Sequence, residues 1–519
     1  MERVAGGGET YNAAVELVDR AVERGLGEKP AFIDRTRQLT YRELRDDACR
    51  LAGMLRALGL RREQRVAMIM HDTVAFPVVF LGAMRTGVVP VPLNTLLTAG
   101  QYAYTLQDCR ARALFVSAAL LPVVEPVLGR LADLETVIVV DGQRESGFLD
   151  FATELARHPP TFEAAPTHPD EPAFWLYSSG STGMPKGVKH VHTSLMATAR
   201  LFAQGVLGMR EDDVVFSAAK LFFAYGLGNG LTFPLACGAT ALLLDERPTP
   251  KAVFDVLKRD RATIFCGAAT GFAGMLADPA CTPENGSDRL RLCVSAGEAL
   301  PEGVGLRWRE RFGVDVIDGI GSTEMLHIYV SNAPGDVKYG TTGRPVPGYD
   351  VRLVDEGGVD VAEGAVGELL VRGPTVAEGY WNQREKSRRT FEGSWMRTGD
   401  KFVRDAEGRY TYCGRSDDMF KVSGIWVSPF EVESTLIGHP AVLEAAVVPA
   451  TDDDGLLKPK AYVVLQAGNH GGEPLAGELR EHVKTTIGPW KYPRWIAFVE
   501  ALPKTATGKI QRFRLREPA

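Results

Sequence analysis

One stretch of the chain combines small residues, hydroxyl groups and a single cation in a way that suits phosphate binding. Residues 177–187 read Tyr-Ser-Ser-Gly-Ser-Thr-Gly-Met-Pro-Lys-Gly and contain three serines, one threonine, three glycines and Lys186. Glycine lets a backbone turn sharply and approach a ligand closely. Hydroxyl and exposed N–H groups can donate to an anion, and the lysine adds a point charge. The composition therefore predicts a phosphate-binding loop and chemistry on a nucleotide.

This loop departs from the P-loop pattern G-x-x-x-x-G-K-[ST]. Pro185 stands where that pattern requires glycine, and Gly187 follows the lysine where it requires Ser or Thr. Proline has no N–H, so a loop that donates from every amide would not contain it there. Residues 173–177 predict a strand that enters the loop, and residues 188–192 look extended. A flexible surface linker is the alternative interpretation, and the flanking strand argues against it.

Five short motifs resemble those of the adenylate-forming enzymes, which include acyl-CoA synthetases, peptide-synthetase adenylation domains and firefly-type luciferases. The phosphate-binding loop resembles their signature [ST]-[SG]-G-[ST]-T-G-x-P-K-G. The other four motifs look like G-x-G-x-T-E, T-G-D, G-R-x-D-D and P-K-T-x-x-G-K, and they lie at residues 319–324, 398–400, 414–418 and 503–510. Five matches in family order are far more specific than any one of them alone.

The resemblance implies an enzyme that uses ATP, Mg²⁺ and coenzyme A. A carboxylate attacks the α-phosphate of ATP, pyrophosphate leaves, and a thiol then attacks the acyl-adenylate. The implied catalytic residues are Lys509, which would bridge the carboxylate and α-phosphate oxygens, and Thr182 and Glu324, which would contact the metal. The implied nucleotide-binding residues are Ser178, Ser179, Gly180, Ser181, Thr182, Gly183, Lys186, Gly297, Glu298, Asp318, Gly319, Ile320, Gly321, Ser322, Thr323, Asp400, Arg415 and Lys509.

The same resemblance assigns each motif to one part of the nucleotide. Residues 178–186 would hold the β- and γ-phosphates, and residues 295–299 and 318–321 would border the adenine. Asp400 would bind the ribose, because a carboxylate can accept from both hydroxyls, and Arg415 would reach the ribose or a phosphate.

A mobile C-terminal domain is also implied. Asp417 matches the hinge of the family, and Ser423 and Gly424 would line the path of the thiol after the domain rotates. A hinge residue need only absorb a backbone change, so Asp417 itself need not take part in the chemistry.

The key polar residues also have structural interpretations. Glu324 could cap a helix or lie on the surface, and Asp400 could be a turn residue. Arg415 could pair with a neighbouring aspartate, Asp417 or Asp418. Lys509 would be a solvated lysine in any other chain, and only the surrounding motif argues for a catalytic role.

The segment at 220–229 alternates aromatic and small residues and predicts the acid pocket. Phe223 stands where many relatives carry histidine, and Ile320, where many have tyrosine, could cover one face of a flat ring. The expected substrate-binding residues are Phe223, Ala224, Tyr225, Gly226, Ile320 and His327, with His327 at the rim. Together with residues 491–495 they resemble the benzoate–CoA ligase branch. Apolar residues at such spacing can also be plain core.

We therefore expect an ATP-dependent aryl carboxylate–CoA ligase, an acid–thiol ligase acting on benzoate, 2-aminobenzoate or a hydroxybenzoate. One hydrogen bond or one methyl group separates these acids, which is about 1–3 kcal/mol of discrimination. A fatty acid fits less well, because bulky rings crowd the predicted pocket. Three alternatives are a free-standing adenylation enzyme that loads a carrier-protein thiol, a luciferase-like oxygenase, and a non-catalytic nucleotide-binding protein.

The bulk composition excludes some classes. The 519 residues carry a net charge of −6, which offers no basic face for nucleic acid. The N-terminus has no apolar leader and no run approaches the roughly 20 residues needed to span a bilayer. Seven scattered cysteines fit reduced, buried thiols in the cytoplasm. We expect small-molecule partners and no nucleic acid or membrane, with a homodimer as one option for assembly.

Alternating helices and strands must position these motifs. Thr40 and Glu43 form a capping-box pattern before an amphipathic helix that stops at Gly59. A strand at 65–70, a helix at 75–86 and a strand at 88–91 follow. Further strands are predicted at 213–218, 241–245, 262–266 and 291–295. This βαβ rhythm predicts parallel sheets that are covered on both faces.

Beyond about residue 340 the pattern changes to short β segments at 350–354, 367–371 and 410–412. After Arg415 a new α+β pattern begins, with helices at 430–437 and 474–486 and strands at 441–448 and 460–465. We expect an α/β protein with two domains. Residues 1–416 would form a large N-terminal domain of layered α/β sheets with a closing β-barrel-like part, and residues 417–519 a small α+β domain that carries Lys509.

Overall fold

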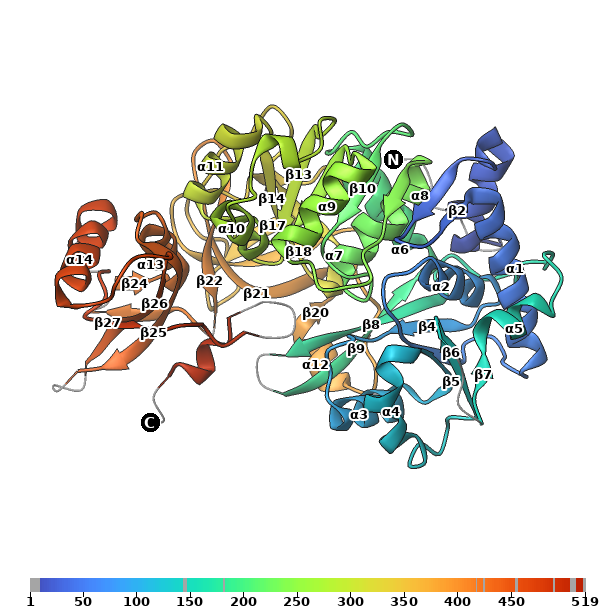
Figure 1. The fold of residues 1–519 in the computed structure, drawn as a ribbon. Coiled ribbons are helices and arrows are strands. Elements are labelled where there is room, and N and C mark those ends of the chain that lie inside the picture. The colour runs from blue at the N-terminus through green and yellow to red at the C-terminus, as the bar shows by residue number, and fades with distance from the viewer. Residues whose placement is uncertain are drawn as a thin grey trace.

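The computed structural model describes residues 10–142, 147–180, 183–416, 418–422, 425–452, 456–488, 491–504 and 510–516. Figure 1 shows a large body of sheets and helices and, beside β21 and β22, a smaller group of elements that ends the chain. This is the mixed α/β architecture that the sequence predicts.

The first long helix forms for local reasons. The helix α1 (Tyr41–Ala57) begins after Thr40, whose side chain accepts a hydrogen bond from the Glu43 N–H. The Glu43 carboxylate accepts in return from the Thr40 N–H at 2.8 Å, which completes the predicted capping box. The apolar positions Leu44 and Leu55 are fully buried, so one face of the helix joins the core.

A five-stranded sheet near the N-terminus is parallel throughout and has the order β4-β3-β5-β6-β7. Its strands are β3 (Arg65–Ile69), β4 (Val89–Pro92), β5 (Ala111–Ser117), β6 (Thr136–Val140) and β7 (Leu149–Asp150). The connecting helices are α2 (Ala75–Arg85), α3 (Ala99–Cys109), α4 (Leu121–Leu128) and α5 (Phe151–Ala156), with the short η3 (Ala118–Leu120) before α4. The predicted βαβ rhythm is confirmed here.

A nine-stranded sheet with the order β16-β15-β14-β13-β12-β10-β11-β1-β2 forms the centre of the large body. Its strands are β1 (Pro30–Ile33), β2 (Gln38–Thr40), β10 (Val214–Ser217), β11 (Thr240–Leu242), β12 (Ile264–Gly267), β13 (Leu292–Ala296), β14 (Val316–Gly321), β15 (Ile328–Ser331) and β16 (Arg344–Pro345). The strands from β1 to β14 along this order pair in parallel, which brings their carboxyl ends to one edge.

Helical segments connect and flank these strands. They are η1 (Val15–Asp19), η2 (Val22–Leu26), α6 (His192–Thr198), η4 (Ala199–Gln204), α7 (Ala224–Leu227), η5 (Gly228–Thr232), α8 (Phe233–Cys237), α9 (Pro250–Asp260), α10 (Ala269–Ala277), η6 (Pro283–Asn285), α11 (Glu302–Phe312) and η7 (Thr323–Met325). Most of the large fully buried side chains are aromatic, with Trp308 and Tyr329 among them, so rings fill much of the core.

The predicted phosphate-binding loop is a β-hairpin. The strands β8 (Pro172–Gly180) and β9 (Gly183–Val191) are antiparallel, and Ser178 pairs with Lys186. The short strand β19 (Gly379–Tyr380) pairs with the other side of β9. The extended conformation predicted for residues 188–192 ends one residue early, because His192 begins α6.

A five-stranded antiparallel sheet is the closing β part of the large body. It contains β17 (Asp350–Val354), β18 (Gly367–Arg372), β20 (Phe391–Glu392), β21 (Trp395–Arg404) and β22 (Tyr410–Arg415), and α12 (Arg384–Thr390) lies before β20. The β segments that the sequence predicts at 350–354, 367–371 and 410–412 all belong to it.

The last part of the chain forms its own core, with Phe420, Val432 and Leu479 among its buried residues. Its elements are β23 (Phe420–Val422), β24 (Ile425–Val427), α13 (Pro429–Ile437), β25 (Val442–Thr451), β26 (Leu457–Leu465), α14 (Glu473–Ile487), β27 (Trp495–Phe498) and η8 (Arg512–Arg514). These are the dark orange to red elements of Figure 1. The domain boundary at 416–417 stays a prediction.

The fold bears on two expectations from composition, namely the state of the cysteines and the presence of membrane-spanning helices. All seven cysteines are free thiols, and six of them are buried, as expected for apolar core residues. Within the part of the chain that the structure describes, no helix has the length and apolar character to cross a bilayer.

Candidate active site

Lys186 and Glu324, which belong to two different motifs, form an ion pair. The Lys186 Nζ lies 2.9 Å from the Glu324 Oε1, and the two side chains are only 12% and 13% exposed. The Tyr380 hydroxyl lies 2.7 Å from the Lys186 Nζ and 2.9 Å from the same Glu324 oxygen. The hairpin, η7 and β19 therefore bring a cation, an anion and a phenol together at one point.

The electrostatics of this cluster keep Glu324 ionised. Burial by itself raises the pKa of the carboxyl, but the Lys186 charge and hydrogen bonds from Lys186 and Tyr380 outweigh it, so the pKa lies below its usual value. The alternative role of Glu324 as a helix cap does not apply, because Ser322 caps η7 and its hydroxyl accepts from the Met325 N–H at 3.2 Å.

The chemistry of these groups fits a metal–phosphate ligand. Mg²⁺ prefers oxygen ligands and usually binds through one or two carboxylates plus phosphate oxygens. Glu324 supplies such an oxygen, Lys186 supplies a counter-charge for phosphate, and the buried Ser178 Oγ has no partner among the described residues. Within the described ranges, no group of three or more His, Cys, Asp or Glu side chains is arranged to hold a metal ion by itself.

The tip of the hairpin carries several predicted residues that cannot be placed. Ser181 and Thr182 lie outside the described residues, and only the backbone is described for Ser179, Gly180 and Gly183. Four further predicted residues, Lys509, Asp417, Ser423 and Gly424, also lie outside the described residues.

The residues predicted to border the adenine follow the adjacent parallel strands β13 and β14. Asp318 pairs in register with Ser295, and Gly319 with Ala296. Burial raises the pKa of Asp318 to about 8, against hydrogen bonds from backbone N–H groups, and its Oδ1 has no described partner. Along the chain the predicted set continues through Ile320, Gly321, Ser322 and Thr323 into η7.

Gly297 and Glu298 lie in the loop that follows the carboxyl end of β13. Gly297 has φ +90°, a conformation that L side chains rarely adopt, and no atom lies within 4 Å of where a Cβ would sit. The Glu298 carboxylate accepts from the Thr270 hydroxyl at 3.3 Å. Open space around a left-handed glycine fits a position that a ligand approaches closely.

Asp400 and Arg415 face each other across β21 and β22. They pair in register, and the Arg415 Nη1 lies 3.1 Å from the Asp400 Oδ1. Asp400 is only 8% exposed and lies within the strand β21, so it is not simply a turn residue. Asp418, an alternative partner for Arg415, instead lies 2.6 Å from the Arg516 Nη2.

The segment predicted to line the acid pocket, residues 220–229, contains the helix α7. Phe223 precedes the helix and packs against Phe222 at 4.4 Å between ring centroids. Ala224 is 9% exposed, and the Tyr225 hydroxyl donates to the Val294 carbonyl at 2.9 Å. A Cβ on Gly226 would lie 2.0 Å from the Lys220 carbonyl oxygen, so only glycine fits there.

The predicted substrate residue His327 is a buried core side chain. It is 3% exposed, and its ring packs against Phe233 at 4.4 Å and against Tyr225 at 5.6 Å between centroids. Burial lowers the pKa of this imidazole to about 3, so it is neutral. Gly228 makes room for it, because a Cβ there would lie 2.4 Å from the imidazole Cδ2. His327 is therefore a buried side chain, and its contact with substrate stays a prediction.

Tyr380 is the residue of this site that sequence reasoning missed. It lies outside all five motifs, and it is 194 residues from Lys186 along the chain. The only local signal is a Gly-Tyr pair in a glycine-rich region, which predicts a turn or edge strand and not a contact with the hairpin.

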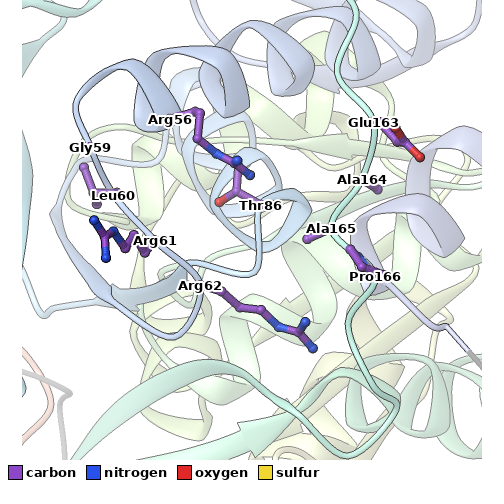
Figure 2. Close-up of a pocket in the computed structure, with 10 residues that line it drawn as sticks. All are labelled: Arg56, Gly59, Leu60, Arg61, Arg62, Thr86, Glu163, Ala164, Ala165 and Pro166. Atoms are coloured by element: carbon purple, nitrogen blue, oxygen red, sulfur yellow. The ribbon is translucent and has the colours of Figure 1, made fainter. Parts of the chain in front are cut away.

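The structure also has a pocket of about 820 Å³ away from these residues, lined by Arg56, Arg61, Arg62, Thr86 and Glu163 among others. Figure 2 shows these side chains around the pocket, and none of them is a predicted site residue. Chemistry therefore places the site at the hairpin and not in this cavity.

Known proteins similar to this chain share its full length. A benzoate–CoA ligase of Thauera aromatica is 56% identical over 510 residues, which cover 98% of this chain and 96% of that protein. A 4-hydroxybenzoate–CoA/benzoate–CoA ligase of Rhodopseudomonas palustris is 55% identical and covers 98% and 94% of the two chains.

Solved structures agree with this. The anthranilate CoA ligase AuaEII, in complex with anthranoyl-AMP, matches with a TM-score of 0.95 and 43% identity over 98% of this chain and 97% of that one. A benzoate CoA ligase from Burkholderia xenovorans LB400 matches with a TM-score of 0.91 and 50% identity over 98% and 100%. These similarities confirm the predicted benzoate–CoA ligase-like branch and the predicted fold class.

The profile of the AMP-binding enzyme family matches residues 18–381, and that of the AMP-binding enzyme C-terminal domain matches residues 431–509. The two matches cover most of the chain, in the order that the motifs predict. The chain belongs to the AMP-binding enzyme family.

Proposed function

We propose that this protein is an ATP-dependent aryl carboxylate–CoA ligase. It activates a benzoate-type acid as the acyl-adenylate with release of pyrophosphate, and then transfers the acyl group to the thiol of coenzyme A. The observation that carries the proposal is the Lys186–Glu324 pair at the hairpin, in a chain 55–56% identical to two benzoate–CoA ligases over nearly its whole length.

In this proposal three charged side chains bind the nucleotide and its metal. Lys186 offers its ammonium to the β- and γ-phosphates, and Glu324 offers a carboxylate oxygen to the metal. Asp400, oriented by Arg415, accepts from the ribose hydroxyls. Bound Mg²⁺ would add positive charge at the triphosphate, where it stabilises the departing pyrophosphate.

Benzoate is the acid that we propose first, with hydroxybenzoates and 2-aminobenzoate as related candidates. The segment around α7 offers rings and small residues, and its neighbouring histidine, His327, is neutral and buried. A flat ring with one carboxylate suits such a lining better than a long alkyl chain does. Ring substituents change the binding free energy by about 1–3 kcal/mol, so the rank order needs measurement.

We also propose a two-domain cycle in a cytoplasmic enzyme that takes small-molecule substrates. The boundary lies at residues 416–417, with Asp417 as the hinge, Lys509 as the cation at the α-phosphate, and Ser423 and Gly424 along the thiol path. Support comes from the separate core of the last part of the chain and from its own family match at residues 431–509. A homodimer is part of this proposal.

The test is ATP–pyrophosphate exchange, followed by thioester formation, with benzoate, the hydroxybenzoates, 2-aminobenzoate and decanoate. We expect exchange with the ring acids and CoA thioesters as products. A parallel assay with a phosphopantetheinylated carrier protein distinguishes the alternative acceptor. The proposal is wrong if no ring acid supports exchange while the enzyme binds ATP.

A further inference from the structure

The hydroxyl of Tyr380 contacts both members of the central ion pair. It lies 2.7 Å from the Lys186 Nζ and 2.9 Å from the Glu324 Oε1, and Thr390 Oγ1 is 3.4 Å away. Lys186 also lies over the Tyr380 ring, with its Nζ 3.9 Å from the ring centroid. Tyr380 itself is only 5% exposed, so water cannot easily replace its hydroxyl.

The direction of each hydrogen bond follows from the groups. An ammonium has no acceptor, so Lys186 donates to the phenolic oxygen. An ionised carboxylate has no donor, so the phenol donates its proton to Glu324. A phenol ordinarily has a pKa of about 10, so Tyr380 keeps that proton at neutral pH. One hydroxyl thus satisfies a cation and an anion at once.

The backbone around Tyr380 holds the phenol and the metal segment together. The Ala377 N–H donates to the Glu324 carbonyl at 2.8 Å, and the Thr375 hydroxyl donates to the Met325 carbonyl at 2.7 Å. Tyr380 pairs with Val188 of β9, so β19 also touches the hairpin. The strand β19 therefore ties the segment of Glu324 to the strand that carries Lys186.

A ligand that uses both charges must separate them. Lys186 and Glu324 lie 2.9 Å apart and neutralise each other. A phosphate attracts the lysine and a divalent cation attracts the carboxylate, so the direct contact must open when both bind. A buried charge that loses its partner is costly unless another hydrogen bond remains. The Tyr380 hydroxyl is the group placed to supply that bond to each charge.

We propose that Tyr380 is a positioning residue for metal–triphosphate binding, which keeps Lys186 and Glu324 in place while their ion pair opens. This rests on the proposed function of the same site. The role concerns ATP and the metal and not the aromatic acid. Loss of the hydroxyl should therefore weaken the binding of ATP and leave the binding of the aromatic acid unchanged.

The experiment compares Tyr380→Phe with Tyr349→Phe as the matched control. Both substitutions remove one buried phenolic hydroxyl, and the Tyr349 hydroxyl lies 2.9 Å from Thr375 Oγ1 on the same connecting segment. Calorimetry measures equilibrium binding of ATP with Mg²⁺ in the absence of any acid. Melting temperatures of the unliganded variants, and the KM values for ATP and for benzoate, complete the set.

We expect Tyr380→Phe to weaken ATP binding about tenfold and to raise the Mg²⁺ concentration at half-saturation several-fold. The KM for benzoate should stay within about twofold, and Tyr349→Phe should bind ATP as the unmodified protein does. Unchanged ATP binding and Mg²⁺ requirement in Tyr380→Phe would overturn the proposal, and so would an equal loss in Tyr349→Phe.

A comparison in the Glu324→Gln background keeps the proposal testable if Tyr380→Phe alone does not fold. In a Glu324→Gln background the hydroxyl still accepts from Lys186 but no longer faces a carboxylate, so the added Tyr380→Phe change should weaken ATP binding by clearly less than about tenfold. A full additional loss in that background contradicts the coupling. Because ATP binding is measured without acid, a failure of the aryl-acid assignment leaves this comparison intact.

Discussion

Lys186 of the phosphate-binding hairpin and Glu324 of η7 form a 2.9 Å ion pair that is almost hidden from solvent. Each charge lies in a region where it would be costly alone, because desolvation penalises an unpaired ion. The pair therefore holds together the two charges that a metal–triphosphate complex would use. Removing one charge of this ion pair gives the first prediction.

Glu324→Gln should lower the melting temperature near neutral pH, because it leaves the Lys186 charge buried without its anion. Breaking a buried pair costs about 3–5 kcal/mol. The folded pKa of Glu324 lies below its usual value of 4.5, so its stabilising contribution is present above that pH and is lost as the pH falls through the folded pKa. Melting curves of both proteins across pH should therefore converge in acid. A difference that persists at low pH would contradict the assignment.

Asp400→Asn should weaken the binding of ATP more than it weakens the binding of 2′-deoxy-ATP. The carboxylate is proposed to accept from the ribose hydroxyls, and a hydrogen bond to a charged group contributes about 1.5–3 kcal/mol. The measurement is the KM of each nucleotide in pyrophosphate exchange, with unmodified protein and variant side by side. Equal losses for both nucleotides would show that Asp400 acts only through its contact with Arg415.

Asp72→Asn should change how stability depends on pH. Asp72 is 4% exposed, it accepts from the Leu221 N–H at 3.3 Å just before the predicted acid pocket, and it lies 3.9 Å from the Lys220 Nζ. Burial raises the pKa of Asp72 from 3.8 to about 6, and the Lys220 charge and the Leu221 hydrogen bond only partly oppose this rise. The Asp245 carboxylate adds to this rise, and burial and the Lys220 charge lower the pKa of the adjacent His71.

The sign of the effect follows from this raised pKa. Between about pH 4 and 6 the folded protein binds more protons at Asp72 than the unfolded chain does, so this group makes stability fall as the pH rises. Relative to the unmodified protein, Asp72→Asn should therefore gain up to about 3 kcal/mol between pH 4 and pH 7. Melting temperatures measured across this range should diverge, and parallel curves would contradict the prediction.

Gly226→Ala should destabilise the protein and disturb the acid pocket, whereas Gly271→Ala should not. A Cβ at Gly226 meets the Lys220 carbonyl oxygen at 2.0 Å, and overpacking of this kind costs about 1–3 kcal/mol. Gly271, in α10, has nothing within 4 Å of its Cβ position, so alanine should add about 0.4–1 kcal/mol of stability there. Melting temperatures of the two variants and the KM for benzoate measure both effects. A stable Gly226→Ala variant with an unchanged KM would disprove the packing argument.

Lys509→Ala should suppress adenylate formation by about 100- to 1000-fold, as for the loss of one group that stabilises transition-state charge. Thioester formation from supplied acyl-adenylate should largely survive, because the proposed cycle moves this lysine away for the second step. The two half-reactions are measured separately. An equal loss in both half-reactions would contradict the proposed two-domain cycle. It would show that Lys509 acts in both steps.

Much of the fold could be predicted, because the signals are local. The capping box of Thr40 and Glu43 and the apolar face of α1 involve residues within a few positions of one another. The strands β3, β10 and β13 are short apolar runs bounded by turn residues, and the structure has them where the sequence predicts them. Backbone geometry and burial of one face determine such elements with little help from the rest of the chain.

The candidate site was predictable only in part. Motif chemistry pointed to Lys186, Glu324, Asp400 and Arg415, since each stands in a pattern of known spacing. It did not reveal that Arg415 lies against Asp400, because that contact depends on the register of β21 and β22. Sequence reasoning expects His327 at the pocket rim. The structure shows its ring buried beside Phe233, and its contact with substrate stays a prediction.

The sequence by itself determined the elements, the order of the motifs and the family, because these depend on residue types and short spacings. Only the tertiary structure decided which side chains meet. Tyr380 reaches Lys186 across 194 residues because β19 pairs with β9, and no local pattern encodes that pairing. The physical reason is that contacts between distant segments arise from the packing of whole sheets, where burial of many residues at once sets the position of each one.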